Sequence, residues 1–310
     1  TSTTQSIQDI IDNAPVNSLF RFPAGATLLC QNLRLPSNSQ VYAHGCKFVV
    51  GGGDSSQFSH GDENFQVGIW NFYGTANSRL ENITIDGGEY IGGRSATNYT
   101  TMADGDAIQA VFVDNLTIKN TTIHDWEQDG IELKGCRNTT VENNFLYDII
   151  DAAIEFRGGE HNIVRHNHTL RVRNGFMCKP FEKANSAGTE NLEHLLVTRN
   201  FFECFHNAIL NNWANHSEFS HNTIKPLSVN GQDGFTRPAI LHEAHPVTLR
   251  GDDVMVGIKT IGNILIGNIT NTFLRQRAST AGATYYQNEV SGNVATGSVN
   301  RGFDLIGVSI

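Results

Sequence analysis

The chain has 310 residues, with 30 glycines, 7 prolines and a formal net charge of −9. The negative charge argues against a nucleic-acid partner, because such proteins depend on cationic contacts to phosphate. No apolar run is long enough to span a membrane, so we expect no membrane partner either.

A short helix is predicted at the start of the chain, over about residues 5–15. Ile7, Ile10, Ile11 and Ala14 follow the spacing of one helical face. The end of a repeat protein would expose its core, so a terminal unit needs a cover. We therefore expect this helix to cap the repeat that follows it.

A unit of 22–23 residues repeats from about residue 16 to residue 300. For example, GIELK at 130–134 matches AIEFR at 153–157, an offset of 23 residues. Each unit has three runs in which apolar and polar residues alternate, which is the period of a β-strand. No helical pattern fills the gaps between the runs. The repeat therefore predicts an all-β solenoid of parallel strands, three to a coil, forming a single domain over residues 1–310.

An asparagine recurs at one place in successive units, as Asn144, Asn167, Asn200 and Asn222, and Thr121 takes that place in an earlier unit. We expect each asparagine at a tight bend, near the left-handed region that this residue tolerates. Coils stack about 4.8 Å apart, so the amides should form a ladder. We expect this ladder to be structural.

The period, the parallel strands and the asparagine ladder together resemble the right-handed parallel β-helix proteins of the pectate-lyase-like superfamily. That superfamily includes polysaccharide lyases, polygalacturonase-like hydrolases, alginate-modifying enzymes and phage tailspikes. The resemblance covers roughly residues 5–300 and implies that one strand of each coil lines a sugar-binding groove. Here that strand corresponds to GIELK, AIEFR, GFMCK and AILNN.

Four insertions in the repeat are expected to form loops. Residues 89–104 and 180–191 adjoin the groove strand, so we expect them to wall the groove. Residues 225–238 and 242–254 belong to later coils. Loops on a rigid scaffold commonly carry binding function.

Polar residues on and beside the groove strand should form three columns, because corresponding residues of neighbouring coils lie above one another. One outward column is acidic, the next is basic, and the third lies just before the strand. In that order they contain Glu132 and Glu155; Lys134, Arg157 and Lys179; and Asp106, Asp129 and Asn174, with Asp151 beside the third. Cations bind uronate carboxylates, so this surface favours an acidic polysaccharide as ligand over a purely structural lattice of ion pairs.

β-Elimination is the reaction that we expect first. It requires a neutralised uronate carboxylate and a base, which Lys134, Arg157 and Lys179 could supply. Glu132 and Glu155 could hold Ca²⁺. The set resembles the calcium-dependent pectate and alginate lyases in its ingredients, without a matched motif.

Glycoside hydrolysis is the alternative. Polygalacturonase-like hydrolases carry Asn-Thr-Asp, Asp-Asp and Gly-His-Gly motifs before the groove strand, and of their acidic residues this chain retains Asp129 and Asp151. Another pair is Asp129 with Glu132 or Glu155, since hydrolysis needs two carboxylates flanking the bond. The expected substrate contacts are Asp106, Asp151, Asn174, His206 and Trp213.

A third possibility is a glycan-binding or tailspike-like adhesion module whose groove only binds. A tailspike-like protein would form a homotrimer. The carbohydrate ligand leads us to expect an extracellular or virion-associated location, although no signal peptide is visible in the sequence.

Overall fold

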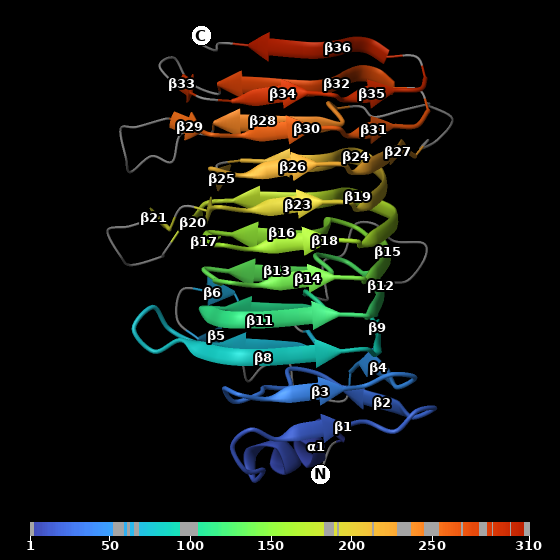
Figure 1. The fold of residues 1–310 in the computed structure, drawn as a ribbon. Helices are drawn as coiled ribbons and strands as arrows, with labels where there is room; N and C mark the ends of the chain where they lie inside the picture. Colours follow the sequence, from blue (N-terminus) through green and yellow to red (C-terminus); the bar gives the residue numbers. More distant parts are fainter. Residues whose placement is uncertain are drawn as a thin grey trace.

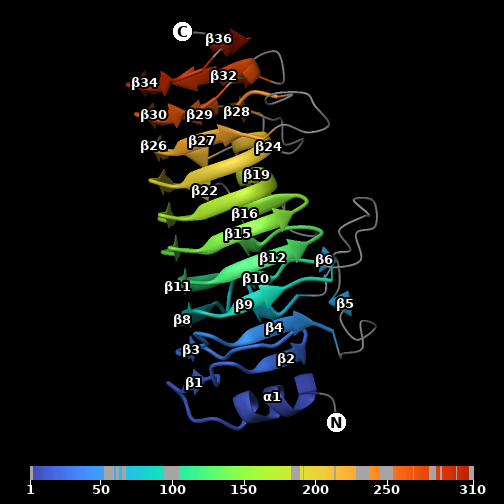
Figure 2. The ribbon, with the colours of Figure 1, turned by 90° about the vertical axis from the view of Figure 1, so that its right-hand side faces the viewer.

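The computed structural model is a tall column of stacked coils, with the N-terminus at one end and the C-terminus at the other (Figure 1). A view from the side shows the same stack (Figure 2). The parts of the chain that the structure describes are residues 3–51, 59–60, 63–64, 68–93, 105–182, 189–190, 192–212, 214–227, 237–244, 254–267, 269–278, 284–286, 288–297 and 299–306.

One face of the column is a ten-stranded parallel sheet, to which each coil contributes one short strand. Its strands are β1 (Leu19–Arg21), β3 (Gln40–Tyr42), β8 (Leu80–Asp86), β11 (Val113–Lys119), β14 (Thr140–Glu142), β18 (Ile163–Arg165), β23 (Leu196–Thr198), β26 (Glu218–Ser220), β30 (Lys259–Ile261) and β34 (Glu289–Ser291).

A seventeen-stranded sheet forms the other two faces. One face carries the strand predicted to line the groove and is called the groove face here. It contains β7 (Trp70–Tyr73), β10 (Ile108–Val111), β13 (Ile131–Lys134), β16 (Ala152–Arg157) and β28 (Ile240–Ala244). The third face contains β2 (Thr27–Cys30), β4 (Lys47–Val50), β9 (Glu89–Ile91), β12 (Thr122–Trp126), β15 (Phe145–Ile149), β27 (Thr223–Pro226), β31 (Ile264–Leu265) and β35 (Val294–Ala295).

Two long strands join these two faces into one sheet, because each pairs with the third face near its start and with the groove face near its end. They are β19 (His168–Lys179), which pairs with β15 and β16, and β24 (Phe201–Asn211), which pairs with β27 and β28. Nearer the C-terminus, β32 (Ile269–Ala278) and β36 (Val299–Ile306) belong to the groove face, while β31 and β35 are separate strands of the third face. The coil of three strands is thus confirmed. The repeat did not predict that two strands would fuse.

The remaining strands are short. A small parallel sheet contains β17 (Gly159–Glu160), β22 (Leu192–Glu193) and β25 (Ala214–Asn215). Three separate pairs are β5 (Ser59–His60) with β6 (Glu63–Asn64), β20 (Phe181–Glu182) with β21 (Thr189–Glu190), and β29 (Val254–Val256) with β33 (Thr284–Tyr286).

The 23-residue offset sets the register of the groove strands. Ile131 pairs with Ile154, Glu132 with Glu155 and Leu133 with Phe156. The residues expected to point inward are all fully buried: Ile131, Leu133, Ile154, Phe156, Phe176 and Cys178. Because side chains alternate between the faces of a strand, this burial fixes which residues turn outward.

The N-terminal cap is confirmed as α1 (Thr3–Asp12), which lies against the first coil at the bottom of Figure 1. Ile11 is buried and Ile7 packs against the core. The prediction that Ile10 lies on the buried face of the helix was wrong, because Ile10 is 67% exposed. The buried face of the helix is therefore narrower than the apolar pattern in the sequence. In the described part of the chain, no helix is long and apolar enough to cross a membrane.

The asparagine ladder is confirmed, but the predicted backbone conformation was wrong by one residue. Each ladder amide bonds to the next, as from Asn144 Nδ2 to Asn167 Oδ1 at 3.0 Å. The left-handed conformation belongs to the residue before each ladder position, as in Asn143 with φ 57° and His166 with φ 55°. The ladder asparagine can then turn its amide into the coil, where it is buried.

The insertions were expected to begin earlier than they do. Strand pairing continues into three of the predicted ranges, through Glu89–Ile91, Thr223–Pro226 and Ile240–Ala244. Residues 94–104, 228–236 and 245–253 lie outside the described residues. Residues 180–191 begin and end with the antiparallel pair of β20 and β21, and residues 183–188 and 191 are not described.

Candidate active site

The groove face brings the predicted acidic and basic columns side by side. In register, Gln109 pairs with Glu132 and Glu132 with Glu155. Lys134 pairs with Arg157, which pairs with Lys179 on the next coil. Each column is therefore one residue per coil along β10, β13, β16 and β19.

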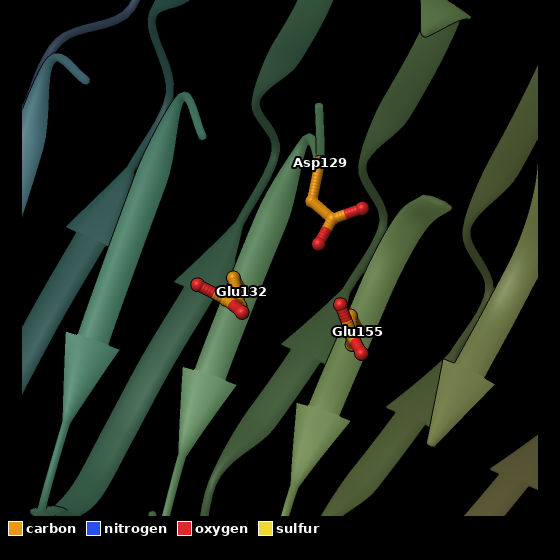
Figure 3. Close-up of side chains that lie close together, drawn as sticks. All are labelled: Asp129, Glu132 and Glu155. Carbon is orange, nitrogen blue, oxygen red and sulfur yellow. The ribbon is translucent and has the colours of Figure 1, made fainter. Parts of the chain in front are cut away.

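Asp129, Glu132 and Glu155 form one tight acidic cluster. Each has a carboxylate oxygen within 4.8 Å of the others. Glu132 and Glu155 come from adjacent strands, and Asp129 lies in the turn before β13 with its carboxyl directed between them (Figure 3). The sequence predicted these side chains on the surface, and this was wrong: Glu132 is 3% exposed and Glu155 is 0% exposed.

The basic column covers and neutralises the two glutamates. Arg157 Nη2 lies 2.9 Å from Glu132 Oε1 and 3.1 Å from Glu155 Oε2. Lys134 Nζ lies 3.0 Å from Glu132 Oε2, and Lys179 Nζ lies 3.2 Å from Glu155 Oε1. Buried charges need such partners, because removing an ion from water is costly. Three cations thus face two glutamates.

Asp129 and Glu155 are neighbouring carboxyl groups in opposite protonation states. Burial, together with the charge of Glu155, raises the pKa of Asp129 well above its usual value. Burial alone would also raise the pKa of Glu155, but Arg157 and a hydrogen bond from Asp129 outweigh it and lower that pKa to about 2. Asp129 is therefore held neutral beside an ionised Glu155.

Two hydrogen bonds hold Asp129 in this position. The backbone N–H of Ala152 donates to Asp129 Oδ1 at 2.8 Å. The proton on the other oxygen is then directed to Glu155, consistent with the hydrogen bond between the two side chains. The sequence Asp129-Gly130 places this carboxyl one residue before the groove strand, where the next coil's N–H is within reach.

Asp106 repeats the arrangement one coil earlier. Its Oδ1 accepts the backbone N–H of Asp129 at 3.1 Å, and Gln109 Nε2 donates to its Oδ2 at 3.0 Å. Gln109 also donates to Glu132 Oε2 at 2.6 Å. Burial, with the nearby charge of Glu132, raises the pKa of Asp106 well above its usual value. Asp106 is 2% exposed and is hydrogen-bonded to Asp129 and Gln109, so it holds the cluster in place. The sequence had predicted a substrate contact for Asp106.

The chain after Lys179 turns back across earlier coils. The ring of Phe181 lies 5.4 Å from the ring of Phe112, centre to centre, and Phe181 is buried with Val111 and Phe112. Val111 pairs in register with Lys134 and lies three coils before Lys179. Phe181 therefore packs against the end of β10, one coil before Lys134.

Asp151, Asn174 and His206 form a second group beside the cluster. Asn174 Nδ2 donates to Asp151 Oδ1 at 3.3 Å, and His206 Nδ1 lies 3.1 Å from Asn174 Oδ1. Asp151 and Arg173 form a loose ion pair at 3.6 Å. Burial and the charges of Arg237 and Arg173 lower the pKa of His206 to about 4. Trp213, the remaining expected contact, lies outside the described residues.

The acidic cluster fits a calcium ion poorly, although its spacing is that of metal ligands. Ca²⁺ takes six to eight oxygen ligands. Here Arg157, Lys134 and Lys179 already hold the glutamate oxygens, and Asp129 carries a proton. An ion would have to displace three cations, so we derive no step through calcium.

Sequence reasoning missed three features of the site. It gave no role to Arg173, although Arg173 precedes Asn174 in the third column. It did not predict that the acids would be buried, because their burial depends on side chains from other coils, among them the cations that pair with them. It also treated Asp129 as one carboxylate among several, because a protonation state follows from burial and partners.

Comparison with known proteins identifies the fold. A family described as right handed beta helix region matches residues 68–236. No curated protein sequence matches the chain significantly. Among solved structures, a polygalacturonase from Erwinia carotovora ssp. carotovora is 11% identical, with a TM-score of 0.66, over 98% of this chain and 94% of that one.

Two other solved structures have different biological roles. A tailspike protein of E. coli bacteriophage HK620, in complex with a hexasaccharide, is 15% identical with a TM-score of 0.60. The match covers 99% of this chain but only 61% of the tailspike. A surface adhesin of Streptococcus pneumoniae is 11% identical with a TM-score of 0.56, over 98% of this chain and 87% of that one.

These identities are low enough that the structural matches establish the fold alone. The family match is independent of them and spans more than half of the 310 residues. It agrees with the parallel pairing of every strand in the two large sheets. The chain therefore belongs to the right-handed β-helix family.

Proposed function

We propose that this protein is a glycoside hydrolase that cleaves an acidic polysaccharide at the Asp129–Glu132–Glu155 cluster. One observation carries the proposal: two adjacent carboxyl groups whose pKa values are moved in opposite directions. Such a pair supplies an acid and a base at the same pH, which is the arrangement that glycoside hydrolysis requires.

Asp129 is the general acid in this proposal. Its retained proton would pass to the glycosidic oxygen as the bond to the leaving sugar breaks. Glu155, ionised below it, would face the positive charge that develops on the sugar ring. The spacing of under 4.8 Å is shorter than the roughly 6.5–9.5 Å that leaves room for a water between the groups. It therefore favours attack by a Glu155 oxygen on the sugar carbon as the glycosidic bond breaks. Water, deprotonated by the Asp129 carboxylate, would then release the sugar from Glu155, and the two displacements together retain the configuration.

The β-elimination that the sequence favoured receives less support. Elimination needs an unprotonated base near the uronate. Burial would lower the pKa of Arg157, but Glu155 and Glu132 outweigh it and raise that pKa, so Arg157 stays charged. Lys134 and Lys179 are each paired with a glutamate. The basic column is thus better suited to hold the acids and a sugar carboxylate than to remove a proton.

The known structures of this fold agree with a polysaccharide as ligand without fixing the reaction. They include a polygalacturonase and a tailspike bound to a hexasaccharide. A surface adhesin shares the fold as well, so a groove that binds without cleaving is the competing possibility.

The test is a scan of acidic polysaccharides that follows reducing ends and ultraviolet absorbance together. We expect new reducing ends without the absorbance of unsaturated uronates. Asp129→Asn should abolish them, whereas Asp148→Asn should not. Asp148 is the matched control, because it lies on the third face in an ion pair with Arg171 at 2.6 Å.

Three other results would change the proposal. Absorbance that rises with the reducing ends would establish a lyase. Glycan binding without any product would establish a binding module. Loss of activity on chelation, restored by calcium, would revive the calcium site predicted at Glu132 and Glu155.

The assembly and location predicted from the tailspike resemblance stay predictions. Sedimentation equilibrium would test the homotrimer. An extracellular or virion-associated location agrees with the proposed substrate, and fractionation of the source would test it.

A further inference from the structure

A second charged column begins where the acidic cluster ends. The residues directly before the third column read Asp151, Arg173, His206 and Arg237 on successive coils. Pairing of Ala152 with Asn174 fixes the first step, and pairing of Asn174 with Asn207 fixes the second. Asn207 Nδ2 donates to the carbonyl of Pro238, which fixes the next. The edge of the groove therefore changes from acidic to basic along the axis.

This basic stretch is accessible. The side chains of Arg173 and Asp151 are 43% and 34% exposed, and Arg237 is exposed. Among the described residues, the ion pair of Arg173 is the loose contact of 3.6 Å with Asp151, in contrast with the close ion pairs of Arg157. A ligand carboxylate could replace Asp151 at little cost, because exposed ion pairs contribute at most about 1 kcal/mol.

His206 lies between the two arginines, and its tautomer can be assigned. Asn174 Nδ2 donates to Asp151, so Asn174 Oδ1 faces His206 and accepts from its Nδ1–H. Nε2 is then a hydrogen-bond acceptor. The low pKa of about 4, which follows from burial, Arg237 and Arg173, keeps the ring neutral at pH 7. A neutral acceptor suits a sugar hydroxyl.

We propose that Arg173, His206 and Arg237 form a binding subsite for a carboxylated sugar residue, at the side of the cleavage site toward the C-terminus. This rests on the proposed function, whose substrate it defines more closely. The arginines would bind the uronate carboxylate in the planar, two-pronged manner that guanidinium groups provide. His206 would accept a hydroxyl of the same or the next sugar.

Position supports this assignment. Coils rise about 4.8 Å each, so Arg173 stands about 10 Å along the axis from Asp129, and Arg237 about 19 Å. A polysaccharide lying along the column across Asp129 would therefore continue over these residues. The subsite selects acidic sugars, and the catalytic cluster need not do so.

The test measures binding in an Asp129→Asn background, so that no glycan is cleaved. The probes are oligosaccharides of galacturonate, glucuronate and alginate, and the same oligosaccharides after chemical reduction of their carboxyl groups. We expect at least one acidic oligosaccharide to bind about ten-fold or more tightly than its reduced form, as for hydrogen bonds to charged groups. Arg173→Gln and Arg237→Gln should each remove most of that difference.

Arg171→Gln is the matched control. Arg171 lies on the same strand as Arg173, but in the part that belongs to the third face, where it pairs with Asp148. It should leave both affinities unchanged. His206→Gln should weaken acidic and reduced probes alike, since it acts on a hydroxyl.

Two results would overturn the subsite. One is a failure to discriminate: either the protein binds acidic and reduced probes with equal affinity, or an arginine variant loses affinity for both kinds of probe equally. The other is no binding of any acidic probe. In either case, cleavage of a neutral glycan by the unmodified protein, lost in Asp129→Asn, would leave the hydrolase proposal standing.

Discussion

Two buried polar columns run through this β-helix, and they differ in how their hydrogen bonds are satisfied. The asparagine ladder is complete within itself. Asn167 Oδ1 accepts from the N–H and Nδ2 of Asn144, and its Nδ2 donates to Val141 O and Asn200 Oδ1. The acidic cluster holds three carboxyls within 4.8 Å, and it is stable only with a trapped proton and three cations.

The difference separates a structural column from a reactive one. Amides carry no charge, so stacking them costs no repulsion and each rung repeats the last. Carboxyls stacked at the same rise must either lose charge or gain partners. In this cluster Asp129 loses its charge and Glu155 gains cationic partners. The result is an acid and a base side by side, which a reaction can use.

The largest expected effect comes from Asp129→Asn. We expect kcat to fall about 1,000-fold, equivalent to about 4 kcal/mol, as for loss of a general acid. The free energy of unfolding should change by less than about 1 kcal/mol, because Asp129 is already neutral and the amide can donate to Glu155. Kinetics and urea unfolding on one preparation would measure both. A large loss of stability with unchanged kcat would show that Asp129 is a structural residue, like the asparagines of the ladder.

The opposite pattern is expected for Asn167→Ala. It removes the hydrogen bonds that the Asn167 side chain makes with the Asn144 N–H and the Val141 carbonyl, so unfolding should become about 3 kcal/mol easier. The kcat should stay unchanged below the lowered Tm. Asn143→Gly is the control: Asn143 is exposed and left-handed with φ 57°, so glycine should be tolerated there. Equal losses at both positions would contradict a specific role for the ladder.

pH should act on the two carboxyls with opposite sign. The pKa of Asp129 is raised on folding, so its contribution to stability is complete below the unfolded value near 3.8 and is lost as pH rises through the folded value. The pKa of Glu155 falls from 4.5 to about 2, so its contribution is present above 4.5 and is lost as pH falls toward 2. Activity should decline on the alkaline side alone.

Urea unfolding from pH 3 to 9 would resolve the two carboxyls. Asp129→Asn should reduce the alkaline component to the part that Asp106 contributes and keep the acid one. An activity profile with an acid limb near pH 5 would contradict an ionised Glu155.

The smallest effect is expected for an ion pair that links coils on the exposed face. Arg165 and Glu142 lie 2.7 Å apart, but the arginine side chain is 44% exposed. Glu142→Gln should lower the free energy of unfolding by less than about 1 kcal/mol, and this loss should disappear at high salt. Glu155→Gln, in contrast, leaves Lys179 without its buried partner and Arg157 with Glu132 alone, and should cost about 3 kcal/mol at any salt concentration. Equal, salt-sensitive losses would show that burial does not distinguish the two pairs.

The register of the groove strands could be predicted without the structure. A period of 23 residues and a two-residue alternation are properties of the chain itself, and a parallel stack converts them directly into columns. Glu132 above Glu155 and Lys134 beside Arg157 followed from this. The period did not predict that the ladder continues to Asn263, because 41 residues separate Asn263 from Asn222 and hide the repeat.

By itself, the sequence determined the fold class, the capping helix, the inward residues and the membership of each column, because all of these depend on local periodicity. Only the tertiary structure decided which carboxyl keeps its proton. That outcome depends on Arg157 reaching both glutamates and on the Ala152 N–H meeting Asp129. Burial and charge act between coils, over distances that no repeat of sequence encodes.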